Sequence, residues 1–279
     1  INQGFDIEEV YLNAPLPDSI SILVISELRS PLLAKEMDHL QEFINRGGNL
    51  FVLGGPGRQE LMNPIIEQFG VRFMPGQLVQ PTPLLQADLI QAIPTDEGAA
   101  YWSNLDFIRK NEGCVAMPGC VGLEYTPTDG ITVVPLLSTD TTGCWNRIVA
   151  TDFVRDSVRY MPETGDQAGI FTTTLALTRN VNDLEQRVLI VGNTDFLSNG
   201  EFATGRREVR NFNGILKHAA FYWLSHEELP VNTEGDAPID RKLYVSEAAM
   251  EIWSIVFMVV IPVILALAGI IIWVRRRGR

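Results

Sequence analysis

Histidine and cysteine are both scarce in this chain, with three copies of each in 279 residues. His39, His218 and His226 are scattered, and no Cys-x-x-Cys pair or Cys/His cluster accompanies them. A zinc site needs several such ligands at short spacings, and a serine or cysteine nucleophile needs a placed base. We therefore predict no metal and no cofactor.

Nucleophile and phosphate-binding motifs are also missing. The apolar runs end in VISELRSP, VLGGPGRQE and IVGNTDFLS, and none places a serine or cysteine between the two glycines of a nucleophile elbow. The chain has no G-x-G-x-x-G and no G-K-[ST], so the glycines after residue 53 predict a turn rather than a nucleotide site. We predict a protein that is not an enzyme.

Basic residues are few relative to acidic ones, and the formal net charge is −12. Without the four arginines at the C-terminal end, 18 basic residues face 34 acidic ones. Such an acidic balance argues against binding to nucleic acid and against lying flat on anionic lipid.

The three cysteines are Cys114, Cys120 and Cys144. An odd count permits one disulfide and one free thiol in an extracytoplasmic domain. Cys114 and Cys120 are close in sequence and form the first candidate pair. The alternative is that all three are small apolar core residues.

One long apolar segment is present, from residue 252 to residue 274, with 23 residues and no charge. As a helix it would extend about 34 Å, enough to cross a ~30 Å hydrocarbon core. Trp253 and Trp273 stand at its two ends, as interfacial aromatics do, and Pro262 and Gly269 are tolerated in membrane helices. We predict a transmembrane helix over 251–275; a helix buried in a globular core is the disfavoured alternative.

The charges beside this segment predict its orientation. Upstream, only Arg241 and Lys242 lie near it, whereas four arginines follow it at once: Arg275, Arg276, Arg277 and Arg279. By the positive-inside rule the tail 276–279 is cytoplasmic, and everything before residue ~250 is extracytoplasmic. We expect a single-pass protein of the cell (inner) membrane whose main domain has no access to cytosolic ATP.

The first part of the chain reads as a strand, a helix and a strand. Residues 19–26 and 49–55 are short apolar runs suited to buried parallel strands. Between them, Ser30-Pro31 predicts a helix start, Leu33, Met37, Leu40 and Ile44 lie on one helical face, and Gly47-Gly48 predicts the end. This is a βαβ unit, followed by a second helix that Gly70 ends.

The remaining chain completes an α/β domain over residues 1–227. Residues 75–148 are rich in proline, glycine and short apolar runs, which predicts a β-rich, loop-rich insertion. Residues 171–179 and 187–192 predict strands joined by a turn at Asn182-Asp183, and apolar positions 216–223 predict a helix. We expect a three-layer sandwich with a mostly parallel sheet. Residues 228–250 read as a juxtamembrane stalk.

Polar residues crowd the end of the strand at 187–192: Asn193, Thr194, Asp195, Ser198 and Asn199. The carboxyl end of a buried strand is where α/β proteins hold ligands, so these residues are the candidate ligand or partner contacts. The local alternative, which we favour, is that Asp195 and its neighbours hold a turn. Without a second carboxylate alongside, a cation site is weakly supported.

Five stretches together resemble the GldG family of auxiliary proteins of ABC-2-type export systems. They are 188–199 (VLIVGNTDFLSN), the strand–helix–strand block 21–55, 63–73 (NPIIEQFGVRF), 133–147 (VVPLLSTDTTGCWNR) and the span ending in tryptophan and arginines. The sequence departs from the pattern at Asn193, where the family often has aspartate, and this weakens a cation site further. The domain type is related to a domain of eukaryotic intraflagellar-transport proteins and, more distantly, to class I glutamine-amidotransferase-like folds.

The resemblance implies a non-catalytic extracytoplasmic domain anchored beside an ABC-2 permease, with a separate cytosolic ABC ATPase supplying energy. In flavobacteria the family is tied to gliding motility, and in some members permease and domain are one chain, which would fit a longer polypeptide before Ile1. Two alternatives stay open: an independent bitopic receptor with a pocket at Asn193–Asn199, and a degenerate hydrolase or amidotransferase-like enzyme.

Overall fold

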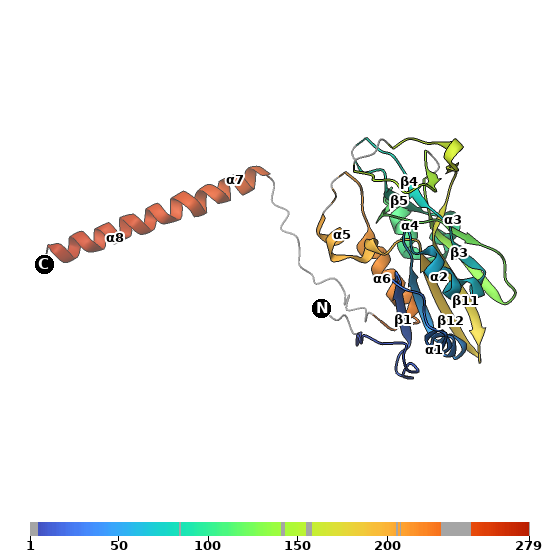
Figure 1. The fold of residues 1–279 in the computed structure, drawn as a ribbon. Coiled ribbons are helices and arrows are strands. Elements are labelled where there is room, and N and C mark those ends of the chain that lie inside the picture. Colours follow the sequence, from blue (N-terminus) through green and yellow to red (C-terminus); the bar gives the residue numbers. More distant parts are fainter. Residues whose placement is uncertain are drawn as a thin grey trace. The chain divides into compact units, whose positions relative to one another are not determined.

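The computed structural model describes residues 5–83, 85–140, 143–154, 158–204, 206, 208–229 and 247–278. Internal contacts divide the chain into two units, Ile1–Val231 and Asn232–Arg279, and each is described by itself. The first unit is an α/β domain and the second contains a long helix (Figure 1).

The predicted βαβ unit is confirmed. It consists of strand β1 (Ile22–Ser26), helix α1 (Ala34–Asn45) and strand β2 (Asn49–Leu53), and the two strands pair in parallel. The helix begins later than the sequence predicts, because the cap is Leu33, whose backbone N–H donates to Glu36 Oε2 at 2.8 Å. This bond satisfies one of the free N–H groups of the first turn, as in a capping box.

The main sheet is mixed and strongly curled, so the prediction of a mostly parallel sheet is wrong. Among the described strands of this sheet, β1, β2 and β12 pair in parallel, and the remaining pairings are antiparallel. The order is β1-β2-β12-β11-β8-β5-β6, with β3 and β7 joined at β11. The other bounds are β3 Val71–Phe73, β5 Leu89–Pro94, β6 Val115–Pro118, β7 Leu123–Tyr125, β8 Ile131–Ser138, β11 Thr172–Val181 and β12 Leu184–Val191.

The turn at Asn182-Asp183 explains part of this difference. Both residues have positive φ, 51° and 64°, which is the conformation of a tight two-residue hairpin. Such a turn folds β12 back beside β11, so the pair is antiparallel.

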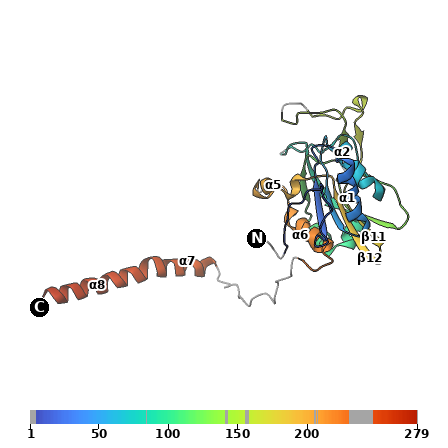
Figure 2. The same ribbon diagram turned by 60° about the horizontal axis from the view of Figure 1, so that its bottom comes forward.

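The central strands are buried on both faces, which is why their sequences read as continuous apolar runs. Along β2, Leu50 and Val52 pack against α1 and α2 (Gln59–Ile66), whereas Phe51 and Leu53 pack with α6 (Asn213–Leu224). Figure 2 shows α1 and α2 on one side of the sheet and α5 and α6 on the other.

The region 75–148 is more than an insertion of strands and loops. It supplies β5, β6 and β8 to the main sheet and contains two helices that the sequence did not predict, α3 (Asp96–Tyr101) and α4 (Ser103–Lys110). A local signal for α3 exists, since the Thr95 hydroxyl accepts the Gly98 N–H at 2.8 Å and acidic residues fill the first turn. The short helical turns elsewhere in the domain are Glu67–Phe69, Pro162–Thr164, Asp195–Leu197 and α5 (Asn199–Thr204).

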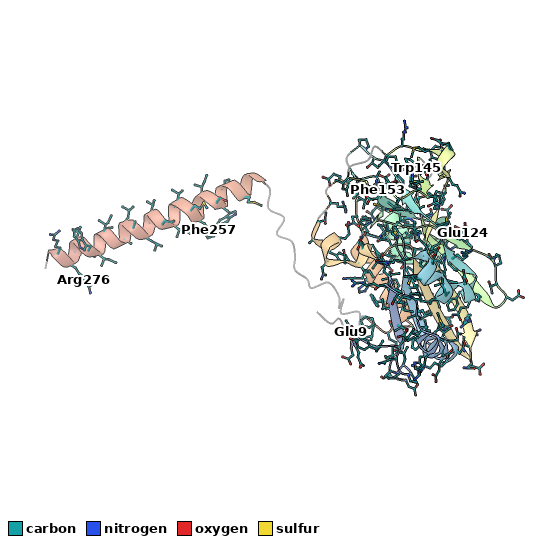
Figure 3. All side chains as sticks on the ribbon, viewed as in Figure 1. Glu9, Glu124, Trp145, Phe153, Phe257 and Arg276 are labelled. Carbon is teal, nitrogen blue, oxygen red and sulfur yellow. The ribbon has the colours of Figure 1, made fainter. Side chains whose placement is uncertain are left out.

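A second, small sheet contains β4 (Gln77–Val79), β9 (Trp145–Arg147) and β10 (Gln167–Ala168). Beside it, the guanidinium of Arg147 donates to both oxygens of Asp166 at 2.9 and 3.0 Å, with both side chains fully buried. Figure 3 places Trp145 and Phe153 at one end of the domain and Glu9 at the other.

The described part of the second unit is a continuous helix through α7 (Glu247–Ile255), a π-helical turn (Val256–Val260) and α8 (Ile261–Arg277). Pro262, which lacks an N–H and crowds the preceding turn, lies two residues after the end of the π-helical turn. Ile252–Arg277 covers 26 residues with a mean hydropathy of 3.2, so it is long and apolar enough to cross a membrane. Of the predicted stalk, residues 230–246 lie outside the described residues.

Candidate functional site

The end of β12 is pressed against the segment that follows β6. The Val121 N–H donates to the Gly192 carbonyl at 2.8 Å, and a Cβ at Gly192 would lie 1.9 Å from the Val121 carbonyl oxygen. Only glycine permits this approach of two backbones.

Asn193 is a structural brace rather than an open ligand contact. Its side chain is 1% exposed, and its amide nitrogen donates to the carbonyls of Pro118 and Gly119. Its Oδ1 accepts the Phe196 N–H at 2.7 Å, which caps the helical turn Asp195–Leu197. The amide therefore joins the ends of β12 and β6, and both its nitrogen and its oxygen already have hydrogen-bond partners.

The remaining predicted contacts divide between structural roles and the surface. Ser198 Oγ accepts the Glu201 N–H at 3.0 Å and caps α5, and Thr194 Oγ1 donates to the Gly54 carbonyl at 3.4 Å. Asp195 and Asn199 are exposed. Among these neighbouring polar residues, it is the amide of Asn193 that caps the helical turn Asp195–Leu197.

The predicted pair Cys114 and Cys120 is not a disulfide, and these two cysteines and Cys144 are buried thiols outside any disulfide. Cys114 precedes β6 and Cys120 follows it. Because an extended strand rises about 3.3 Å per residue, the four residues of β6 hold the two Cα atoms farther apart than the ~7 Å limit for a bridge. Burial raises the pKa of the Cys114 thiol to about 11 and raises the pKa of Cys120 further still. The alternative of small apolar core residues fits their burial.

A charged cluster lies beside the strand end. Arg206 donates to both carboxylate oxygens of the buried Glu201 at 2.6 and 2.7 Å. Burial raises the pKa of Asp88, although the positive charge of Arg206 acts in the opposite direction. Within the described ranges, no group of three or more His, Cys, Asp or Glu side chains could hold a metal ion.

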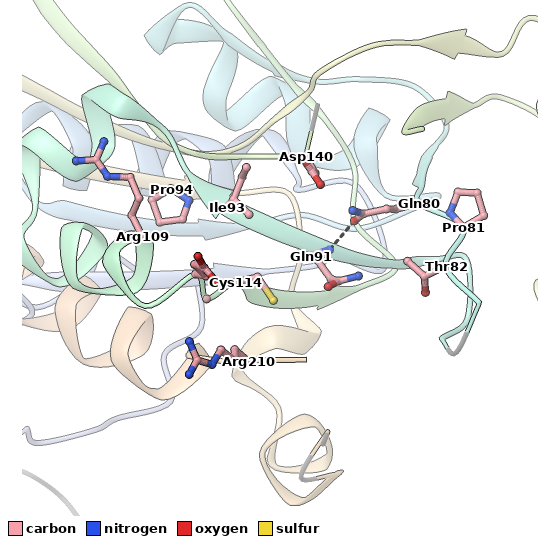
Figure 4. Close-up of a pocket in the computed structure, with 12 residues that line it drawn as sticks. Gln80, Pro81, Thr82, Gln91, Ile93, Pro94, Arg109, Cys114, Asp140 and Arg210 are labelled. Atoms are coloured by element: carbon pink, nitrogen blue, oxygen red, sulfur yellow. Dashed lines mark hydrogen bonds between the residues drawn. The ribbon is translucent and has the colours of Figure 1, made fainter. Parts of the chain in front are cut away.

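Two cavities of the domain lie away from the predicted contacts. The larger has a volume of about 570 Å³ and lies over β5 between the segment 80–82 and the end of α4 (Figure 4). The smaller, about 320 Å³, lies between the α3–α4 junction and the C-terminal part of α6. Neither cavity is lined by a residue from 193 to 199, so neither is the pocket that the receptor alternative places at that strand end.

The smaller cavity is aromatic, and sequence reasoning missed it. Trp102 and Trp223 lie within it with ring centroids 5.6 Å apart, and the guanidinium of Arg187 lies 5.4 Å from the Trp223 ring. The buried Trp102 Nε1 has no hydrogen-bond partner in the described structure. Exposed aromatic rings continue along the same helices and α5: Tyr101, Phe107, Phe202 and Tyr222.

Comparison with known proteins supports the fold and goes no further. No protein-family model matches this sequence, and no curated protein matches it. Among solved structures, the chain is similar to one titled "mmIFT52 N-terminal domain", with a TM-score of 0.52 and 13% sequence identity. The match covers 75% of this chain and 78% of that chain, and at this identity it shows the shared fold alone.

Proposed function

We propose that this chain is a non-catalytic, membrane-anchored auxiliary subunit of an ABC-2-type export system, and that it belongs with the GldG-like proteins. Its α/β domain is extracytoplasmic and contacts the permease. The cytosolic ABC ATPase acts through that permease, and the domain presents the same surface to cargo.

The observation that carries the proposal is the helix Ile252–Arg277 at the end of an α/β domain of this fold. None of the residues in its most apolar stretch is buried, so its apolar surface needs another solvent, which a bilayer supplies. Arg275, Arg276 and Arg277 lie in its last turn, where positive charge favours the cytoplasmic side. In Figure 3, Phe257 and Arg276 mark the apolar part and the basic end.

The aromatic surface supports a role in binding another protein. Tyrosine and tryptophan are enriched at the centres of protein interfaces because they bury much area and lose little side-chain entropy. The hollow between Tyr101, Tyr222 and Trp223 suits an inserted aromatic or apolar side chain of a partner.

The two alternatives have less support. A receptor pocket at Asn193–Asn199 would need an open strand end, and Asn193 is enclosed there by three hydrogen bonds. A hydrolase would need a histidine beside a serine or cysteine. His39 bonds instead to the Leu12 carbonyl and His226 to Asn49.

Affinity purification from native membranes tests the proposal. The full chain, tagged and solubilised in mild detergent, is expected to bring down an ABC-2 permease and its ATPase. The control is a chain whose span is replaced by an unrelated transmembrane helix, which keeps the domain and its anchoring. Recovery of neither transporter component with the native chain, under conditions where a known exporter stays intact, would contradict the proposal.

A further inference from the structure

The larger cavity plays no part in the proposed function. Its floor is β5, where Gln91 and Ile93 face away from the core side chains of Ile90 and Ala92. Its walls come from segments far apart in the sequence, which is why no local sequence motif predicts it (Figure 4). A volume of about 570 Å³ lies within the ~300–1,000 Å³ range of small-molecule sites.

Gln80 is a buried polar side chain with unused hydrogen-bonding capacity in this cavity. It is 6% exposed, and its Oε1 accepts the Gln91 backbone N–H at 2.7 Å. Its Nε2 has no partner among the described residues, and the amide end points into the group of lining side chains in Figure 4. Buried amides are normally satisfied, so this nitrogen is a donor available to a ligand.

A second polar group in the same wall is also unsatisfied. Thr82 Oγ1 is buried, and it has no hydrogen-bond partner in the described part of the chain. Because this oxygen has almost no accessible surface, it lies behind the lining, and the Gln80 amide is the neutral polar group that a ligand can reach.

The charged groups of the lining differ in how far they are neutralised. Arg109 is paired with Asp96 at 2.9 Å and with Asp106 at 3.0 Å. Arg210 donates to the Asn111 carbonyl at 2.6 Å and forms no ion pair with any described residue. The carboxylate of Glu112 likewise forms no ion pair or hydrogen bond within the described structure. Asp140, the other carboxylate of the lining, has an interaction of its own, so Arg210 and Glu112 are the cation and the anion that remain available at this cavity.

We propose that this cavity binds a small zwitterion, an amino acid or a short peptide. Arg210 pairs with the carboxylate of the ligand and Glu112 with its ammonium group. Gln80 bonds to a polar group of the ligand, and Ile93 contacts its apolar part. The proposal goes beyond the exporter role and does not rest on it, since the cavity lies within the α/β domain alone.

Calorimetric titration of the full chain in detergent micelles tests this site. The probes are glycine, alanine, glutamate, lysine, dialanine and trialanine, each compared with its N-acetyl amide, which lacks both end charges. At least one charged probe is expected to bind, and its capped form to bind at least about tenfold more weakly, because charge-assisted bonds are lost.

Two exposed substitutions avoid the risk of unfolding. Arg210→Gln and Glu112→Gln are each expected to weaken binding of that probe by about tenfold. Arg72→Gln, which removes an exposed pair with Glu67 on β3, is the matched control and is expected to leave affinity unchanged. No binding by any probe at millimolar concentration, equal binding of the capped forms, or unchanged affinity of both variants would each overturn the assignment. None of these results bears on recovery of the permease in the membrane purification.

Discussion

Asn193 and Asp195 are two residues apart, yet their environments differ completely. The Asn193 amide is buried and bonded on both sides, whereas the Asp195 carboxylate is exposed. The sequence shows both as polar residues after a strand and does not distinguish them. Burial depends on how closely Gly192 lets the Val121 backbone approach, and that contact is distant in sequence.

We predict that Asn193→Ala lowers the free energy of unfolding by about 1–3 kcal/mol, because the Phe196 N–H and the Pro118 carbonyl lose their partner. Asp195→Ala, the matched exposed change, is expected to shift it by less than about 0.5 kcal/mol. Urea unfolding with an unchanged m-value checks both. The reverse order of effects would make Asp195 the structural residue.

The thiols of Cys114 and Cys120 give a second residue-level prediction. Because burial raises their pKa values well above neutrality, the reactive thiolate is a minute fraction at pH 8. In the folded chain both are expected to react with iodoacetamide far more slowly than a free thiol does. After unfolding without reductant, mass spectrometry is expected to find all three cysteines alkylated. A pair that resists alkylation would show that a disulfide is present and contradict this prediction.

At the scale of elements, long periodic or apolar runs were predicted well and short elements were not. The apolar face of α1 and the buried positions of α6 follow the helical repeat, so both were found. Strands that are buried on both faces have similar sequences in parallel and antiparallel pairings, so the sequence did not predict the direction of the strands. Helices α3 and α4 cover six and eight residues, too few for a clear repeat.

The buried ion pair of Arg147 and Asp166 stabilises the small sheet and the chain beside it. The Asp166 carboxylate also accepts the Met161 N–H at 2.9 Å, and Arg147 donates to the Arg159 carbonyl, so the pair joins three segments. We predict that Asp166→Ala costs about 3–5 kcal/mol, because it leaves a buried guanidinium uncompensated.

Thermal unfolding and limited proteolysis between residues 147 and 166 measure this effect. Glu67→Gln, which breaks the exposed pair with Arg72, serves as control and is expected to cost under about 0.5 kcal/mol. The double change Arg147→Met with Asp166→Leu is expected to recover much of the loss, since no charge is left unpaired. An Asp166→Ala variant as stable as the Glu67→Gln control would show that the pair contributes nothing.

At the scale of the whole molecule, the apolar helix was predictable to within a few residues because it is a one-dimensional signal of length and composition. The cavities and the aromatic surface were not, because each assembles residues from separate segments. We therefore propose that the contact surface is the helical face of α3, α4 and α6 rather than the end of β12.

The central claim is that this helical face contacts a permease in the same membrane. Its most direct test is photo-crosslinking in intact cells, with benzoylphenylalanine placed at Tyr222 on the aromatic surface or at Glu60 on α2, both exposed positions on opposite faces of the sheet. The account predicts a crosslink from position 222 to an ABC-2 permease and none from position 60. Crosslinks to the permease from position 60 alone, or from neither position while the chain resides in the membrane, would contradict it.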